Sequence, residues 1–132
     1  MDEKVKKELL LQQHNPFIQH NNMRVTELDE NRCEAALIVT EHAYNPFGTV
    51  HGGALFTLAD LCCGVAARAD GRHYVTENAD IAYLRPAAGD KITAVAEILH
   101  RGRSRCVIEV RLRDAQSHLV CSGTFSFFCK ES

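Results

Sequence analysis

The chain has 132 residues, a formal net charge of -2 and 24% charged residues. This length suits a single domain covering residues 1–132, which can bury about two thirds of its unfolded surface in its own core. The weakly acidic balance argues against nucleic acid as the main partner, because binding to a phosphate backbone needs a basic stripe. The longest apolar run is interrupted by Asp60 and stops at Arg68, which argues against a membrane-spanning segment.

The N-terminal residues carry acidic side chains and a short leucine run, a pattern that suits neither a secretory signal nor a transit peptide. We therefore expect a cytoplasmic protein. Its six cysteines show no CxxC spacing and lie mostly in apolar segments, which is typical of reduced, buried thiols and disfavours a disulfide framework or a metal site. They are Cys33, Cys62, Cys63, Cys106, Cys121 and Cys129.

The first third of the chain predicts a short helix followed by two strands. Residues 2–13 read as an amphipathic helix with Asp2 and Glu3 at its positive end, and Asn15-Pro16 ends it. Residues 23–40 change to an alternating pattern that is broken by a turn at residues 29–31. This alternation favours two strands.

A long helix is expected next, from the His51-Gly52-Gly53 corner to about Asp70. Apolar residues recur at steps of three and four on one face, and the other face is apolar as well, so the helix is expected to be buried on all sides. Asp60 is a carboxylate inside it. Removing an ionised carboxylate from water costs several kcal/mol unless something compensates. Asp60 is therefore either a functional residue or a hydrogen-bonded structural one.

Four further strands are predicted, at residues 73–84, 91–99, 106–113 and 119–128. Pro86 ends the first of them, because proline cannot donate to a sheet ladder. The fold class is therefore α+β, with five to six antiparallel strands curled around one long central helix and a short N-terminal helix. Such a sheet leaves an edge, and we expect that edge to pair with a second subunit.

The run NPFGTVHGGALFTLAD at residues 45–60 resembles the signature of hotdog-fold thioesterases of the phenylacetate-degradation type. The segments YLRPAAGD, HRGRSR and LVCSGTFSFF are similar to later strands and turns of that family. The resemblance implies an acyl-CoA thioesterase that needs no metal or redox cofactor, coenzyme A being part of the substrate. It also implies a homodimer that pairs into a tetramer, and aryl or hydroxylated aryl acyl groups as leading substrates, followed by medium-chain acyl groups.

The start of the long helix is a candidate oxyanion site, and close helix–sheet packing is the alternative role for Gly52 and Gly53. The first-turn N–H groups of Gly52 and Gly53 would have no partner within the helix and would lie at its positive end. Asp60 would act as base or nucleophile, but it lies about 10 Å along the axis from Gly53. One reacting carbon cannot reach both. Two helices packed antiparallel across a two-fold axis could provide both groups, which predicts active sites at a dimer interface.

Other candidates surround this pair. Asn45 either orients the carbonyl or water, or serves as a turn residue. His51 is either a catalytic base or an imidazole that binds local backbone and shapes the corner. Thr76 matches a hydroxyl-bearing position in the family and would contact the attacking water. Val50 and Arg85 are candidate substrate-binding residues.

The basic turn after residue 100 offers Arg101, Arg103 and Ser104 to the phosphates of coenzyme A. A solvated hairpin is the alternative for this turn. Two other functions stay open for the whole chain: a non-catalytic acyl-CoA-binding or regulatory protein, and a hydratase or dehydratase on the same fold. An intact Asp60 argues against the first, and the absence of a suitably spaced His and carboxylate pair argues against the second.

Overall fold

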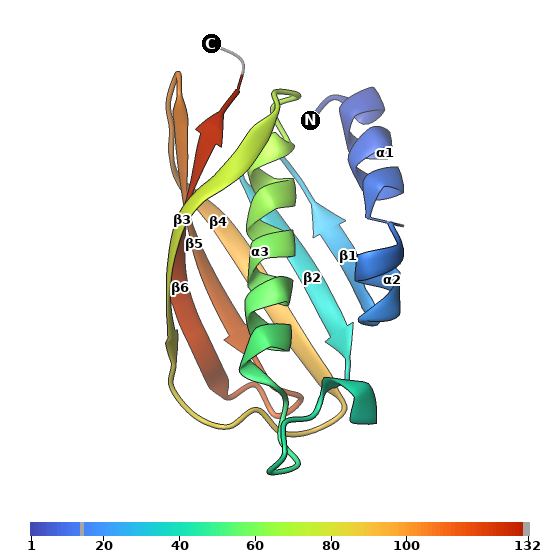
Figure 1. Cartoon of the computed structure of the whole chain (residues 1–132). Helices are drawn as coiled ribbons and strands as arrows, with labels where there is room; N and C mark the ends of the chain where they lie inside the picture. The colour runs from blue at the N-terminus through green and yellow to red at the C-terminus, as the bar shows by residue number, and fades with distance from the viewer. Residues whose placement is uncertain (14, 131–132) are drawn as a thin grey trace.

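A six-stranded antiparallel sheet curves around one long helix, α3 (Gly52–Arg68), as Figure 1 shows. The computed structural model describes residues 1–13 and 15–130. The strand order is β1-β2-β4-β5-β6-β3, which leaves β1 and β3 at the edges. The strands are β1 (Met23–Leu28), β2 (Arg32–Ile38), β3 (Tyr74–Tyr83), β4 (Lys91–Arg101), β5 (Arg105–Arg113) and β6 (Leu119–Cys129). The predicted α+β hotdog architecture is confirmed.

The N-terminal segment contains two helices where one was predicted. Helix α1 (Glu3–Gln12) begins at Asp2, whose carboxylate accepts hydrogen bonds from the N–H groups of Lys4 and Val5. The second, α2 (Pro16–His20), begins at Asn15, whose side chain accepts from the N–H of Ile18. The Asn15-Pro16 pair therefore both breaks the chain direction and starts a new helix, since proline fits the first helical position. A short 3-10 helix, η1 (Glu41–Ala43), follows β2.

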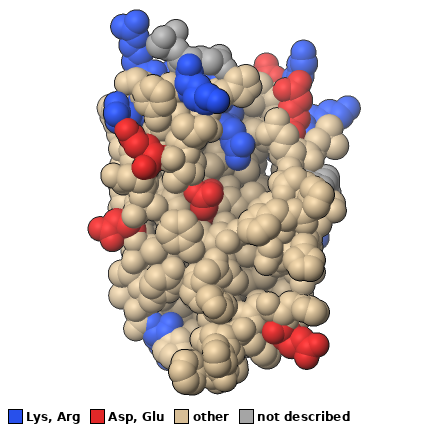
Figure 2. Space-filling view, in the orientation of Figure 1, with Lys and Arg blue, Asp and Glu red and all other residues tan. Residues whose placement is uncertain are grey.

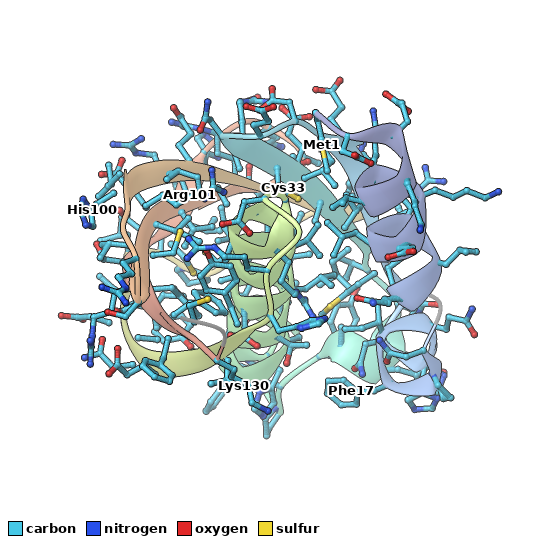
Figure 3. All side chains as sticks on the ribbon, turned by 90° about the horizontal axis from the view of Figure 1, so that it is seen from above. Met1, Phe17, Cys33, His100, Arg101 and Lys130 are labelled. Atoms are coloured by element: carbon cyan, nitrogen blue, oxygen red, sulfur yellow. The ribbon has the colours of Figure 1, made fainter. Side chains whose placement is uncertain are left out.

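Helix α3 packs one side into the concave face of the sheet. Its fully buried residues include Leu58, Ala59 and Cys62, and it lies against β2, β4 and β5. The prediction that this helix is buried on all sides is wrong for the single chain: Gly53 and Phe56 are exposed and Asp60 is half-buried. Seen along α3 in Figure 3, the sheet curves round one side of the helix while α1 and α2 stand at the other.

The open side of α3 faces the viewer in Figure 2 and carries a broad uncharged surface, with charged side chains gathered toward the upper end and the edges. An acidic side chain lies near the middle of this surface. The neighbouring edge strand β3 is exposed along most of its length, including Val75 and Tyr83. An exposed, partly apolar sheet edge is a template for pairing with another chain.

All six cysteines are buried and none is in a disulfide. Their burial agrees with the prediction from the sequence, and it follows from their places on the inward faces of β2, α3, β5 and β6. None of the helices in residues 1–13 and 15–130 is long and apolar enough to cross a bilayer.

Candidate active site

The loop before α3 is shaped by Asn45. Its Oδ1 accepts hydrogen bonds from the N–H groups of Phe47 (2.9 Å) and Thr49 (3.1 Å), and its Nδ2 donates to Thr49 Oγ1 (2.8 Å). Gly48 completes the turn with a φ of 80°, a conformation that costs glycine little. The amide contacts of Asn45 all lie inside this loop, which is the behaviour of a turn residue.

His51 caps the start of α3. Its Nδ1 accepts the N–H of Gly53 at 2.9 Å, so a neutral ring carries its proton on Nε2. The histidine therefore binds local backbone and shapes the corner, as one of its two predicted roles requires. The expectation that both glycine N–H groups are free is wrong for Gly53, because the adjacent imidazole reaches its amide.

The N–H of Gly52 has no hydrogen-bond acceptor in the described part of the chain. It lies at the first position of α3, where the helix dipole adds positive potential. Tyr83, at the end of β3, leans over this residue and donates its hydroxyl to the Gly52 carbonyl at 3.1 Å. Tyr83 could not be identified from the sequence, because strand alternation does not indicate which residue contacts the start of the helix.

A hollow of about 580 Å³ opens at this end of α3. The sequence-predicted residues Asn45, Val50, Gly52 and Arg85 all line it. Arg85 is exposed, and no hydrogen bond or ion pair engages its guanidinium within residues 1–13 and 15–130. This hollow therefore brings together a free backbone donor and a free cation.

Asp60 lies in a different groove, of about 330 Å³, between α2, α3 and β3. Thr76 Oγ1 donates a hydrogen bond to Asp60 Oδ1 at 2.8 Å. The structure thus brings together two candidates from different elements, the carboxylate on α3 and the hydroxyl on β3. The hydroxyl holds one carboxylate oxygen and leaves the other, Oδ2, without a hydrogen-bond partner among the described residues.

The hollow beside Gly52 and the groove beside Asp60 share no lining residue. Asp60 lies eight residues beyond Gly52, which is about 12 Å along the helix axis. Strand β3 runs the opposite way, so that its Thr76 end meets Asp60 and its Tyr83 end meets Gly52. One chain therefore presents the carboxylate and the amide donor at separate places.

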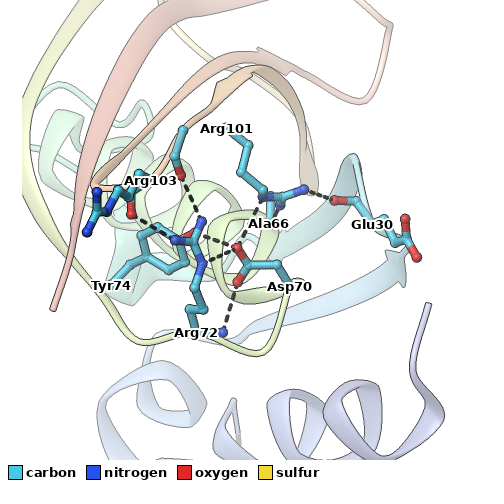
Figure 4. A network of polar contacts seen from close by, with 8 residues as sticks. Glu30, Ala66, Asp70, Arg72, Tyr74, Arg101 and Arg103 are labelled. Atoms are coloured by element: carbon cyan, nitrogen blue, oxygen red, sulfur yellow. Dashed lines mark hydrogen bonds and ion pairs between the residues drawn. The ribbon is translucent and has the colours of Figure 1, made fainter. Parts of the chain in front are cut away.

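Most polar contacts of the basic turn after residue 100 are made with other residues of the protein, as Figure 4 shows. Arg101 donates to the carbonyls of Ala66 and Glu30, both at 2.9 Å, and lies 3.5 Å from Asp70. Arg101 therefore closes the C-terminal end of α3, and these contacts within the protein compete with its predicted role as a phosphate ligand.

The same turn is held by Arg72, which donates to the carbonyls of Arg103 (2.8 Å) and Gly102 (2.9 Å). The Ser104 carbonyl accepts from the N–H of Cys129. The Arg103 guanidinium is exposed and has no ion-pair partner among the described residues. The Arg103 guanidinium and the Ser104 hydroxyl are therefore the two predicted phosphate ligands that could still bind a phosphate.

Asp70 is the acidic centre of this network. Partial burial alone would raise the pKa of its carboxyl, but hydrogen bonds from Tyr74 and Arg72 outweigh that effect and lower the pKa. The network joins the end of α3 to the turn between β4 and β5. We therefore assign it to stability.

Comparison with known proteins identifies the family. A model described as the thioesterase superfamily matches residues 47–121. The acyl-coenzyme A thioesterase PaaI of Escherichia coli is 32% identical over 97 residues, covering 73% of this chain and 69% of that protein. The proofreading thioesterase EntH of Cronobacter turicensis is 27% identical over 113 residues, covering 83% and 82%.

Solved structures agree with these matches. The E. coli PaaI protein from the phenylacetic acid degradation operon superposes with a TM-score of 0.89 at 25% identity, covering 96% of this chain and 94% of that one. A hypothetical thioesterase protein of Streptococcus pneumoniae with coenzyme A gives 0.79 at 29% identity, covering 84% and 88%. Variants of that protein in which a threonine or an aspartate is replaced by alanine are also among the similar structures.

The resemblance recognised in the sequence is confirmed by these comparisons. The family model covers more than half of the chain and includes the Gly52 corner, Asp60 and Thr76. This protein belongs to the thioesterase superfamily and is a thioester hydrolase of the PaaI-like hotdog type.

Proposed function

We propose that the protein hydrolyses a coenzyme A thioester to a free acid and coenzyme A in active sites shared between two copies of the chain. The observation that carries this proposal is the separation of the Asp60–Thr76 groove from the free Gly52 N–H on one chain. A reacting carbonyl must lie near 3 Å from both groups. A second copy has to supply one of them.

The exposed edge of β3 and the open face of α3 suggest how the copies meet. Phe56 lies midway between Gly52 and Asp60 on α3 and is exposed, and Ala79 and Asp80 lie midway between Thr76 and Tyr83 on β3. A two-fold axis near these midpoints would pair β3 with its copy in antiparallel fashion. It would also bring the Asp60 groove of one chain to the Gly52 hollow of the other, as an isologous interface requires.

In such a site the Gly52 N–H would donate to the thioester carbonyl oxygen as negative charge develops on it. Asp60 either removes a proton from the attacking water or attacks the carbonyl carbon itself to give an anhydride that water then opens. Thr76 holds Asp60 Oδ1 in place in both cases. The carbon–sulfur bond breaks and the proton released from water ends on the coenzyme A thiolate.

The substrate class we propose is an aryl acyl-CoA, with medium-chain acyl groups second. The groove beside Asp60 has room for a small ring, and its walls include Phe17, Leu61 and Phe127. The similarity to the E. coli PaaI protein, which is from the phenylacetic acid degradation operon, supports aryl acyl-CoAs as the substrate class.

The test is release of coenzyme A from a panel of aryl and straight-chain acyl-CoAs by wild type and Asp60→Asn, which keeps the shape and removes the charge. Chromatographic detection avoids thiol reagents that would also react with the cysteines. We expect wild type to turn over and Asp60→Asn to lose about two orders of magnitude or more while still binding substrate. Binding without turnover by wild type would favour the acyl-CoA-binding alternative, and loss of double-bond absorbance from enoyl-CoA would favour a hydratase.

A further inference from the structure

The Asp60 groove continues along α3 toward the C-terminal end of the helix and reaches Arg68. Gly64 lies between them, one turn from each, and all three residues line the groove. A Cβ at Gly64 would meet a terminal nitrogen of Arg68 at 3.2 Å and the Phe127 ring at 3.5 Å. The guanidinium therefore folds back over Gly64, about 6 Å along the axis from Asp60.

Arg68 uses few of its hydrogen-bond donors. Its Nε donates to the Gly64 carbonyl at 3.0 Å. Its two terminal amino groups meet no acceptor and no carboxylate at ion-pair distance within residues 1–13 and 15–130. Burial lowers the pKa of this guanidinium, and the charge of Asp60 offsets the effect in part. Arginine only donates, so its natural partner is an oxygen acceptor.

Apolar side chains form part of the wall of the groove that Asp60 and Arg68 share. They come from three different elements and include Ile18 on α2, Leu61 on α3 and Val75 on β3. An acyl group that lies along the groove from Asp60 would place a ring against these side chains. The far side of that ring would then point at the guanidinium.

We propose that Arg68 is a specificity-determining residue that binds an oxygen acceptor at the end of the acyl group remote from the thioester. This inference rests on the proposed hydrolysis at Asp60 and deepens it. A carboxylate is favoured over a hydroxyl, because a guanidinium forms two parallel charge-assisted hydrogen bonds with a carboxylate. The preferred substrates are therefore aryl acyl-CoAs with an oxygen-bearing group on the far ring position.

The test compares three thioesters of matched shape: benzoyl-CoA, 4-hydroxybenzoyl-CoA and 4-carboxybenzoyl-CoA. Wild type is expected to favour the carboxylated substrate over benzoyl-CoA by about tenfold or more in kcat/KM, with the hydroxylated one between. Arg68→Met should abolish this preference, which is measured as the ratio of the kcat/KM values of the three substrates within the same variant. The matched control is Arg24→Met, which removes the same charge from an exposed position on β1 and should leave the preference intact.

A second variant and a binding measurement separate the possible failures. Arg68→Gln keeps a neutral donor and should lose the carboxylate preference while retaining part of the hydroxyl preference; thermal unfolding shows whether each variant is folded. Affinities of the three thioesters for Asp60→Asn, with and without Arg68→Met, report recognition without turnover. Equal kcat/KM values in wild type, or an unchanged ratio in the folded Arg68 variants, would overturn the role of Arg68. If wild type turns over none of the thioesters but their order of affinity depends on Arg68, the role of Arg68 would be supported and the proposed hydrolysis would be overturned.

Discussion

Two inactive variants should restore activity to each other if the active site is shared between chains. Gly52→Pro removes the free N–H at the first position of α3, where proline is tolerated and no hydrogen bond is lost. The preceding residue, His51, has φ -61° and ψ 136°, which suits a residue before proline. A Cβ at this position meets Tyr83 at 3.5 Å, an ordinary contact. We therefore expect the variant to fold.

The expected losses are large for each variant alone. Removing one oxyanion donor typically lowers kcat by about 10²–10³-fold, or about 2.7–4 kcal/mol of transition-state stabilisation. Asp60→Asn should lose about as much or more. Gly52→Ala is the matched control, since it adds a Cβ but keeps the N–H, and its activity should stay within a few fold of wild type.

Mixing distinguishes a shared site from one contained in a single chain. Equal amounts of Gly52→Pro and Asp60→Asn are unfolded together and refolded, so that half of the dimers contain one chain of each kind. Each mixed dimer has one site with an intact Gly52 and an intact Asp60, so about a quarter of wild-type activity should return. Coenzyme A release is measured chromatographically before and after mixing. Activity that stays at the level of the parents, in samples shown by differently tagged chains to contain mixed dimers, would refute the shared site.

Three further predictions follow from the contacts. Thr76→Val removes the hydroxyl that holds Asp60 and should lower kcat about tenfold, whereas Thr76→Ser should retain most activity. Because the folded-state pKa of Asp70 is lowered, its contribution to stability is present above about pH 4 and is lost as pH falls through the folded pKa. The difference in melting temperature between wild type and Asp70→Asn should therefore shrink below that pH, and a constant difference would contradict this. Arg101→Ala should lower the free energy of unfolding by about 2 kcal/mol and leave the KM for acyl-CoA unchanged. A raised KM in Arg103→Ala alone would locate phosphate binding at Arg103. A raised KM in a folded Arg101→Ala would instead support the predicted role of Arg101 as a phosphate ligand.

Much of the architecture was predictable because helices and strands produce regular local patterns of apolar residues. The long helix is marked by apolar residues at helical spacing and by the Gly52-Gly53 corner, and the strands by alternation between Cys106 and Arg113 and in the neighbouring segments. The α2 helix was missed because Asn15-Pro16 signals a break equally well as a helix start. The half-exposed side of α3 was also missed. An apolar pattern predicts that a surface is buried, but it does not indicate whether the same chain or a second copy buries it.

The sequence by itself therefore determined the long helix, the strands, the fold class and the family, because each depends on residues close together in the chain or on a contiguous motif. The partners of individual side chains were decided by the tertiary structure. Arg101 binds carbonyls 71 and 35 residues away, and Thr76 reaches a carboxylate 16 residues away. The strand order places β3 at an edge of the sheet, and residues of α2, α3 and β3 that are distant in the chain line one groove with Asp60 and Arg68. Hydrogen bonding and burial depend on that proximity in space, which spacing along the chain does not encode.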